Sequence, residues 1–293
     1  MHKAGFVNII GNPNAGKSTL MNAFLSQKLS IITAKAQTTR HRILGIFNTP
    51  EAQVVFSDTP GIIKPEYALQ ERMMDATNST FEDADIMLLV IAADDDGDLE
   101  ENTWKRITKF DGRLLIVLNK VDLSNQKDLE QLANFWKKKL PDAEIWSISA
   151  TESFWVLELR DRIVSLLPNH PPFFPKDQIT DKPERFFVNE KIREKILMHY
   201  KKEIPYSVEV ETESFVEEKE IIKIRALIMV ERNTQKGILI GHKGKAIKRI
   251  GEEARKDLES FFDKKIFIEL YVKVNKNWRS NEKELKRFGY QQK

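Results

Sequence analysis

The residues best suited to do chemistry in this sequence form a short stretch near its start, Gly11-Asn-Pro-Asn-Ala-Gly16-Lys17-Ser18. The stretch matches the pattern G-x-x-x-x-G-K-[ST], which is typical of loops that bind nucleoside triphosphates. Its glycines let backbone N–H groups face the phosphates, the lysine reaches the β- and γ-phosphates, and the serine hydroxyl can ligate Mg²⁺. The pattern predicts phosphate binding, without indicating the base, by Gly11, Asn12, Pro13, Asn14, Ala15, Gly16, Lys17 and Ser18.

Two further polar stretches suit the metal and the terminal phosphate. In the first, Asp58 can hold Mg²⁺ through water while the N–H of Gly61 contacts the γ-phosphate. In the second, the hydroxyl of Thr38 or Thr39 completes the Mg²⁺ shell only while the γ-phosphate is present, and we favour Thr39. Hydrolysis would then release both loops, as in a switch. The predicted phosphate contacts are Asp58, Thr59, Pro60 and Gly61, and the predicted Mg²⁺ ligands are Ser18, Thr39 and Asp58.

A third motif, Asn119-Lys120-Val121-Asp122, is suited to recognising a base. A carboxylate at Asp122 can accept hydrogen bonds from the ring N–H and the exocyclic amine of guanine, whereas adenine would leave it unpaired. The loop after the last apolar run could place a backbone N–H against the base oxygen. These residues predict guanine binding by Asn119, Lys120, Asp122, Ser149 and Ala150.

The elements that must position these motifs are short apolar runs close to 30 residues apart, separated or followed by amphipathic stretches such as 129–140 and 156–167. This alternation predicts an α/β domain with a mostly parallel, doubly wound sheet, in preference to a helical domain whose buried helices imitate strands. Ligands of such sheets bind beyond the carboxyl ends of the strands, where the three motifs fall. The predicted strands cover residues 6–10, 54–57, 86–92, 114–119 and 144–149.

Charge is distributed unevenly along the 293 residues, whose overall net charge is +3. Residues 1–170 carry a net charge of −4 and residues 171–293 a net charge of +7, which favours nucleic acid or an anionic membrane as the partner of the second half. The chain has no cysteine, which excludes disulfides, thiolate metal sites and cysteine nucleophiles. Because the longest apolar run has eight residues and the glycine-rich stretch comes early, we expect a cytoplasmic protein without a secretory signal.

The second half begins with a proline-rich stretch in which regular structure is disfavoured. We predict a first domain over residues 1–168, a linker over 169–183 and a second domain with its tail over 184–293. Within the second domain, the pattern predicts the order α-β-β-α-α-β. The predicted elements are a helix over 183–202, a hairpin over 207–215 and 220–232, helical material up to about 263, and a strand over 265–274.

A G-x-x-G turn, Gly241-His-Lys-Gly244, lies in the most basic part of this domain. Glycines let a nucleic-acid backbone approach closely, and lysines pair with phosphates. The nearby Ile238, Ile240 and Ile247 line a groove for unstacked bases, pack the core, or do both. Trp278 and Tyr290 could stack on bases, although for Trp278 we favour an anchor of the tail. The predicted RNA contacts are Ile240, Gly241, His242, Lys243, Gly244, Lys245, Lys248 and Arg249.

In this order the motifs resemble the TRAFAC-class GTPases over residues 1–168 and, more closely, the bacterial Era family, which shares the Q-T-T-R-H-R run at Gln37–Arg42. The second domain resembles a type II KH domain. The resemblance implies an α/β P-loop GTPase domain followed by an α+β KH domain. It further implies a GTP/GDP switch that binds the 3′ end of small-subunit ribosomal RNA and assists assembly of the 30S subunit. We expect a monomer.

The catalytic route is predicted from the residue that follows the D-x-x-G motif, Asp58-Thr-Pro-Gly61. Ras-like enzymes orient the attacking water with a glutamine after the D-x-x-G motif, where this chain has Ile62. The resemblance implies slow hydrolysis stimulated by K⁺, held in part by Asn14, which could instead cap its own turn. The alternatives to the RNA-binding switch are a membrane-associated signalling GTPase, whose basic domain meets anionic lipid at the inner face of the membrane, and a P-loop kinase.

Overall fold

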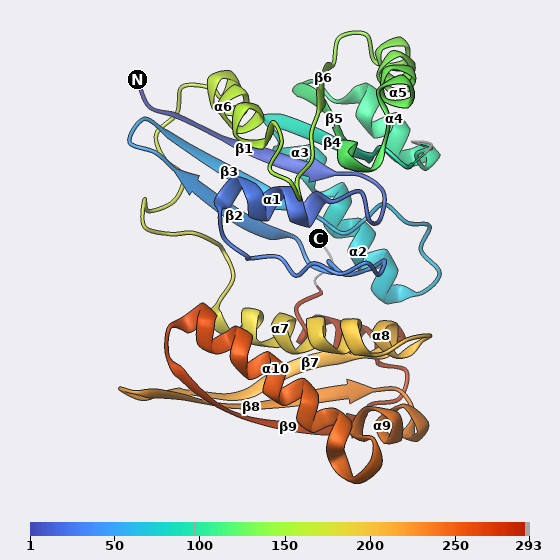
Figure 1. Cartoon of the computed structure of the whole chain (residues 1–293), viewed down its shortest axis with the longest axis vertical. Coiled ribbons are helices and arrows are strands. Elements are labelled where there is room, and N and C mark those ends of the chain that lie inside the picture. Colours follow the sequence, from blue (N-terminus) through green and yellow to red (C-terminus); the bar gives the residue numbers. More distant parts are fainter. Residues whose placement is uncertain (96–97, 291–293) are drawn as a thin grey trace. The chain divides into compact units, whose positions relative to one another are not determined.

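The computed structural model describes residues 1–95 and 98–290, and these form two compact units (Figure 1). The first unit holds Met1–Glu66 and Gln70–Asp181, and the second holds Tyr67–Leu69 and the described residues from Lys182 onward. The last three residues of the predicted second domain lie outside the described part. Each unit has its own sheet.

The first unit contains a six-stranded sheet with the order β2-β3-β1-β4-β5-β6. All neighbours pair in parallel except β2 and β3, which are antiparallel, so the predicted mostly parallel, doubly wound sheet is confirmed. The strands are β1 (Lys3–Ile10), β2 (Ile43–Asn48), β3 (Ala52–Asp58), β4 (Ile86–Ala92), β5 (Arg113–Asn119) and β6 (Glu144–Ser147).

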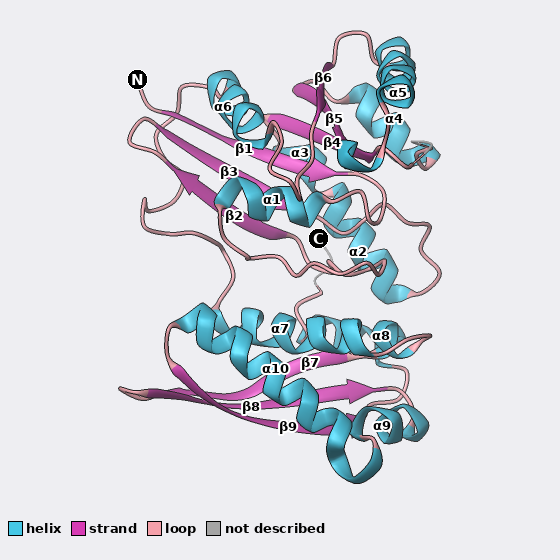
Figure 2. Cartoon of the chain, viewed as in Figure 1, coloured by secondary structure: helices cyan, strands magenta, loops and turns pink. Residues whose placement is uncertain are grey.

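Helices cover both faces of this sheet (Figure 2). Helices α1 and α6 pack on one face, where Phe24 of α1 stacks on Phe56 of β3. The other face carries α3, α4 and α5 around a core that includes Ile107 and Trp136. The helices are α1 (Lys17–Leu25), α2 (Ala68–Asn78), α3 (Thr80–Asp83), α4 (Glu101–Lys109), α5 (Gln126–Lys139) and α6 (Val156–Leu166), with a 3₁₀ turn, η1, over Val121–Leu123.

Strand β2 was not among the predicted strands. It lies at the edge of the sheet beside β3, with three of its residues buried and three partly exposed, and Gly45 divides its apolar residues into two pairs. Because Thr49–Ala52 closes a tight hairpin with β3, the chain reverses here instead of crossing over through a helix.

The proline-rich stretch is attached to this edge of the sheet. Gln53 accepts hydrogen bonds from the backbone N–H groups of Phe173 and Phe174, and Thr180 pairs with Gly45 of β2. These contacts satisfy backbone groups that a free linker would expose to water. Residues up to Asp181 thus belong to the first unit, while the linker at 169–183 and the boundaries beside it remain a prediction.

The second unit has a three-stranded sheet with the order β7-β8-β9, in which β7 and β8 are antiparallel and β8 and β9 are parallel. Helices α7 and α10 pack on it around a core that includes Ile192, Ile224 and Leu258. The predicted α-β-β-α-α-β order is confirmed. The elements are α7 (Glu184–His199), α8 (Ile204–Ser207), β7 (Glu209–Glu217), β8 (Ile221–Val230), α9 (Asn233–Ile240), η2 (His242–Gly244), α10 (Lys245–Phe262), β9 (Lys265–Val274), η3 (Trp278–Ser280) and α11 (Glu282–Arg287).

The two aromatic residues near the C-terminus are structural anchors. Trp278 is 0% exposed, and its Nε1–H donates to the carbonyl of Ser207 at 3.0 Å. Tyr290 is also buried and donates its hydroxyl to Glu209 at 2.8 Å. The anchoring role of Trp278 is confirmed and the alternative of base stacking is wrong for both rings, because neither has a free face.

Candidate functional site

The glycine-rich stretch forms the loop between β1 and α1. Gly16 has φ +93°, which side chains rarely tolerate, and a Cβ there would overlap the amide nitrogen Nδ2 of Asn119. Lys17 folds back over the loop and donates to the carbonyls of Gly11 at 2.9 Å and Asn12 at 2.8 Å. Burial lowers the pKa of Lys17 to about 8, although the charge of Asp58 opposes this. The loop thus has the shape and the buried cation for a phosphate.

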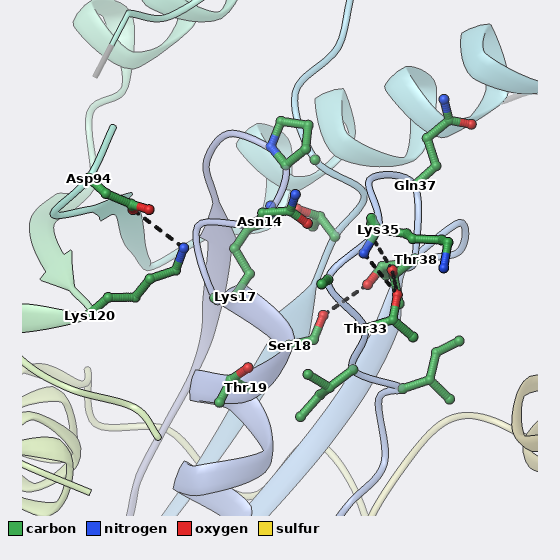
Figure 3. Close-up of a pocket in the computed structure, with 18 residues that line it drawn as sticks. Asn14, Lys17, Ser18, Thr19, Thr33, Lys35, Gln37, Thr38, Asp94 and Lys120 are labelled. Carbon is green, nitrogen blue, oxygen red and sulfur yellow. Dashed lines mark hydrogen bonds and ion pairs between the residues drawn. The ribbon is translucent and has the colours of Figure 1, made fainter. Parts of the chain in front are cut away.

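A cavity of about 450 Å³ opens in front of this loop (Figure 3). Its walls come from the phosphate loop, the segment after α1, the D-T-P-G loop at residues 58–61 and the ends of β4 and β5. The cavity unites motifs that are more than 100 residues apart in the sequence. It is lined by Pro13, Asn14, Gly16, Lys17, Ser18, Thr19, Ile31, Ile32, Thr33, Ala34, Lys35, Gln37, Thr38, Thr39, Thr59, Gly61, Asp94 and Lys120.

The three predicted Mg²⁺ ligands meet beside this cavity. Ser18 Oγ lies 2.9 Å from Thr39 Oγ1 and donates to Asp58 Oδ2 at 2.7 Å. Burial raises the pKa of Asp58, while its hydrogen bond from Ser18 and the charge of Lys17 act in the other direction. Two hydroxyls and one carboxylate are the hard oxygen donors that Mg²⁺ prefers, so the residues fit this ion.

The structure separates the two candidate threonines. The Thr38 hydroxyl donates to the carbonyl of Lys35 at 2.6 Å and lies 2.7 Å from Thr33 Oγ1. Thr39 instead points to Ser18 and Asp58. Thr38 therefore belongs to a local turn, and the geometry favours Thr39 at the metal.

The D-T-P-G loop packs directly on the phosphate loop. Thr59 donates its hydroxyl to the carbonyl of Ile9 at 2.7 Å, and the N–H of Ile62 donates to the carbonyl of Gly11 at 3.1 Å. Ile62 is 5% exposed and has no polar group with which to orient water. Asn14 is exposed on the cavity wall with a left-handed backbone at φ 63°. Its amide is therefore accessible to an ion in the cavity.

On the base-binding side, Asn119 connects two loops. Its Nδ2 donates to the carbonyl of Ala15 at 2.9 Å, and its Oδ1 accepts from the N–H of Ala150 at 3.0 Å. Lys120 reaches toward Asp94 at 3.4 Å across the cavity wall. Asp122 is exposed on η1 and Ser149 is buried. Asn119 thus positions the two loops, whereas Asp122, Ser149 and Ala150 do not line the cavity itself.

Several cavity residues were not predicted. Thr33, Lys35 and Gln37 come from a segment without regular structure, whose path the sequence pattern does not reveal. Asp94 follows β4 almost directly, so its place at the carboxyl end of a strand could have indicated it.

The predicted RNA contacts gather around the turn between α9 and α10. Gly241 has φ 69°, and a Cβ there would lie 2.6 Å from the Cβ of Ala246. His242 and Lys243 are exposed at the tip, and Lys245 begins α10. Lysine side chains add here to the positive end of the helix dipole, which favours an anion such as a phosphate.

A groove of about 340 Å³ runs between α10 and β9. Ile247, which we expected to line a groove, lies in its wall, and so does the predicted RNA contact Lys248. The other predicted contacts and Ile238 lie outside it. The β9 side was not predicted, because no local pattern in the strand indicates which helix packs beside it. The lining is Ile247, Lys248, Gly251, Glu252, Arg255, Ile266, Phe267, Ile268 and Leu270.

Two protein-family models match the chain in agreement with these sites. Residues 6–120 match a family described as "50S ribosome-binding GTPase", and residues 203–279 match the KH domain. By fold and by site, the protein is a P-loop GTPase that carries a KH domain.

Full-length relatives narrow this class. GTPase Era of Thermoanaerobacter sp. (strain X514) is 42% identical over 292 residues, which is 99% of this chain and 97% of that protein. GTPase Era of Syntrophus aciditrophicus (strain SB) is 44% identical over 293 residues, 99% of this chain and 96% of that protein. The chain belongs to the Era family of GTPases.

Two solved structures match nearly the whole chain. Era in complex with MgGDPNP and nucleotides 1506–1542 of 16S ribosomal RNA has a TM-score of 0.94, 37% identity and 99% coverage of both chains. A point variant of Aquifex aeolicus Era bound to GDP·AlF4⁻ has a TM-score of 0.92 and 37% identity, covering 98% of this chain and 99% of that one.

Proposed function

We propose that the protein is a GTP-hydrolysing switch that binds small-subunit ribosomal RNA and assists assembly of the 30S subunit. The observation that carries the switch is the meeting of Ser18, Thr39 and Asp58 beside Lys17. Thr39 comes from a long loop, whereas Ser18 lies on a helix and Asp58 on a strand. A contact between the loop and the γ-phosphate side of the site would therefore form with GTP and be released with GDP.

This geometry supports the residue roles that we propose. The phosphate loop and Lys17 bind the phosphates, Ser18 and Thr39 ligate Mg²⁺, and Asp58 holds it through water. When bound, Mg²⁺ neutralises charge that develops on the phosphates. Asp122 would pair with guanine. The loop at Ser149 and Ala150 would lie beside the base, although the N–H of Ala150 donates to Asn119 Oδ1 at 3.0 Å and that of Ser149 donates to the carbonyl of Phe154 at 3.2 Å.

K⁺ at Asn14 is proposed for the hydrolytic step. Ile62 cannot polarise water, so a cation beside the phosphates is a reasonable substitute for a polar side chain. We expect faster turnover in KCl than in NaCl for the wild type, and equal slow rates in both salts for Asn14→Ala. Equal wild-type rates would contradict the K⁺ role and leave GTP binding intact.

RNA binding is supported by the basic G-x-x-G turn, the match to the KH domain and the neighbour solved with 16S ribosomal RNA. That RNA belongs to the small subunit, whereas the description of the matching GTPase family names the 50S subunit. We place the RNA on Lys243, Lys245 and the groove beside α10, in a protein of the cytoplasm. Fluorescence titration with RNA from the 3′ end of 16S ribosomal RNA tests this at fixed salt.

Gly244→Asp is the discriminating variant. Gly244 has φ 76°, and space around its Cβ position is open, so the substitution adds charge and strain at the turn without a clash. We expect loss of RNA binding with unchanged GTP binding. An unchanged RNA affinity would overturn the KH assignment.

The runner-up is a peripheral membrane GTPase, which the basic second unit would also suit. In the described ranges no helix is both long and apolar enough to cross a bilayer. Co-sedimentation with vesicles of anionic lipid, compared with RNA at equal ionic strength, separates the two. Tight vesicle binding without RNA binding would favour the runner-up.

A further inference from the structure

One face of the sheet in the second unit is open to solvent along β9. Ile266, Ile268 and Leu270 point to the helices and belong to the core or pack against it. The intervening residues point to the opposite face, where Phe267 is 52% exposed and Tyr271 is 48% exposed. Aromatic rings exposed to this degree contribute little burial to the stability of the fold. Their presence on a strand therefore indicates a binding surface.

The two rings are part of one surface. Phe267 pairs with Lys223 of β8 and Tyr271 pairs with Leu227, so the rings lie on the same side as the β8 residues beside them. The guanidinium of Arg225 lies 5.7 Å from the centre of the Tyr271 ring. We call the following exposed residues the open sheet face: Lys265, Phe267, Tyr271 and Lys273 of β9 and Lys223 and Arg225 of β8.

The open sheet face is basic along β9. Two of its four cations lie on β9 and two on β8. Glu269 of β9 pairs with Arg225 at 3.1 Å, and the charge of Glu213 on β7 also acts on Arg225. A third carboxylate, Glu218 of the turn between β7 and β8, pairs with Lys223 at 2.7 Å. In the part of the chain that the structure describes, the two lysines of β9 form no ion pair. A surplus of cations beside exposed rings is complementary to a polyanion that carries planar bases.

The open sheet face is continuous with the RNA groove. Phe267 lines the groove between α10 and β9 and is at the same time half-exposed on the open side. A groove of this kind takes about four nucleotides. A longer strand that leaves the groove past Phe267 therefore reaches the open sheet face directly.

We infer that the open sheet face is a second contact surface for single-stranded RNA, with bases stacked on Phe267 and Tyr271. The inference rests on the proposed RNA binding. Four residues along a strand span about 13 Å, so the rings take different bases. Sheets that present aromatic residues on an open face bind two or three bases in the same way.

The test compares RNA lengths. Fluorescence anisotropy at fixed salt would measure binding of an RNA of about 5 nucleotides, which fills only the groove, and of one of about 12 nucleotides that contains it. Tyr271→Ala should weaken binding of the longer RNA about tenfold and change that of the shorter RNA less than about twofold, because stacking contributes only to the longer strand. Tyr271→Phe keeps the ring and should bind both as the wild type does.

Met198→Ala, an exposed apolar substitution on α7, is the matched control and should leave both affinities unchanged. Equal loss of both RNAs in Tyr271→Ala, or loss of neither, would overturn the inference. Gly244→Asp, in contrast, should abolish binding of both RNAs. If the wild type bound neither RNA, the proposed RNA function and this inference would both be wrong. If Tyr271→Ala changed only self-association in sedimentation, the inference would be wrong and the face would be a contact between protein chains.

Discussion

Asn119 offers the sharpest test of how the nucleotide site is assembled. Its side chain is 2% exposed and makes one hydrogen bond to the phosphate loop, at the carbonyl of Ala15, and one to the base-side loop, at the N–H of Ala150. Asn119→Ala removes both partners at once. The two backbone groups then stay buried without a hydrogen bond.

The cost follows from these two contacts. A buried polar group that loses its partner costs about 1–3 kcal/mol, so the pair costs about 2–6 kcal/mol before the loops relax. Relaxation and entry of water reduce this, and we expect about 3 kcal/mol, shared between folding of the first unit and nucleotide binding. Because the bridge lies away from the γ-phosphate side of the site, GTP and GDP should be weakened by the same factor.

Asn119→Asp separates the two hydrogen bonds. Its carboxylate can still accept from the N–H of Ala150 but places a second oxygen against the carbonyl of Ala15. This variant should therefore lose more stability and more nucleotide affinity than Asn119→Ala. Urea unfolding and titrations with GDP and a GTP analogue at constant Mg²⁺ would measure both effects.

Asn125→Ala removes an exposed N-cap on α5 that accepts from Asp128, and is a control for stability alone. The bridging role of Asn119 would be refuted if Asn119→Ala changed the free energy of unfolding by less than about 0.5 kcal/mol and nucleotide affinity by less than about twofold, a range typical of surface changes. It would be refuted equally by a loss confined to GTP.

Three other predictions concern the contacts of Arg42, Lys17 and Trp278. Arg42, close in sequence to Thr39, donates to Ser57 at 2.6 Å and pairs with Asp83 at 2.8 Å. Arg42→Ala should therefore weaken binding of a GTP analogue about fivefold or more and binding of GDP less than about twofold. An equal loss of affinity for both nucleotides in titrations would contradict this. Because burial lowers the pKa of Lys17 from 10.5 to about 8, the folded protein binds fewer protons than the unfolded chain between these values, and its free energy of unfolding should rise with pH there. Lys17→Met should remove that rise, and an identical pH slope in urea unfolding would refute the assignment. Trp278→Ala should destabilise the second unit by about 3–5 kcal/mol in urea unfolding, because it leaves a cavity and an unpaired carbonyl, and a loss below about 1 kcal/mol would contradict the anchoring role.

The fold of the first unit was predictable wherever strands are buried on both faces. The run over β4 is buried along its whole length, and a short run of this composition predicts a central strand of a parallel sheet. Strand β2 was not predicted because Gly45 divides its apolar residues into two pairs, and because a hairpin joins it to β3 outside the alternation of strands and helices. The attachment of the proline-rich stretch was missed for a related reason, since Gln53 binds its backbone from 120 residues away.

The candidate sites also contain features that the sequence pattern does not reveal. The choice between Thr38 and Thr39 rests on adjacent residues with the same hydroxyl, and only the positions of Ser18 and Asp58 distinguish them. Likewise, Phe267 has no local mark of an RNA contact, and only the packing of α10 beside β9 brings it to the rim of the groove.

The sequence by itself determined the chemistry that contiguous residues carry: the phosphate loop, the base-recognition motif, the G-x-x-G turn and the charge difference between the two halves. A short phosphate loop has its donors fixed by its own backbone, so its composition is enough. The tertiary structure alone decided which distant groups meet, including the bridge of Asn119, the place of Thr39 and the open sheet face. These depend on packing between elements separated by tens of residues, which no local pattern encodes.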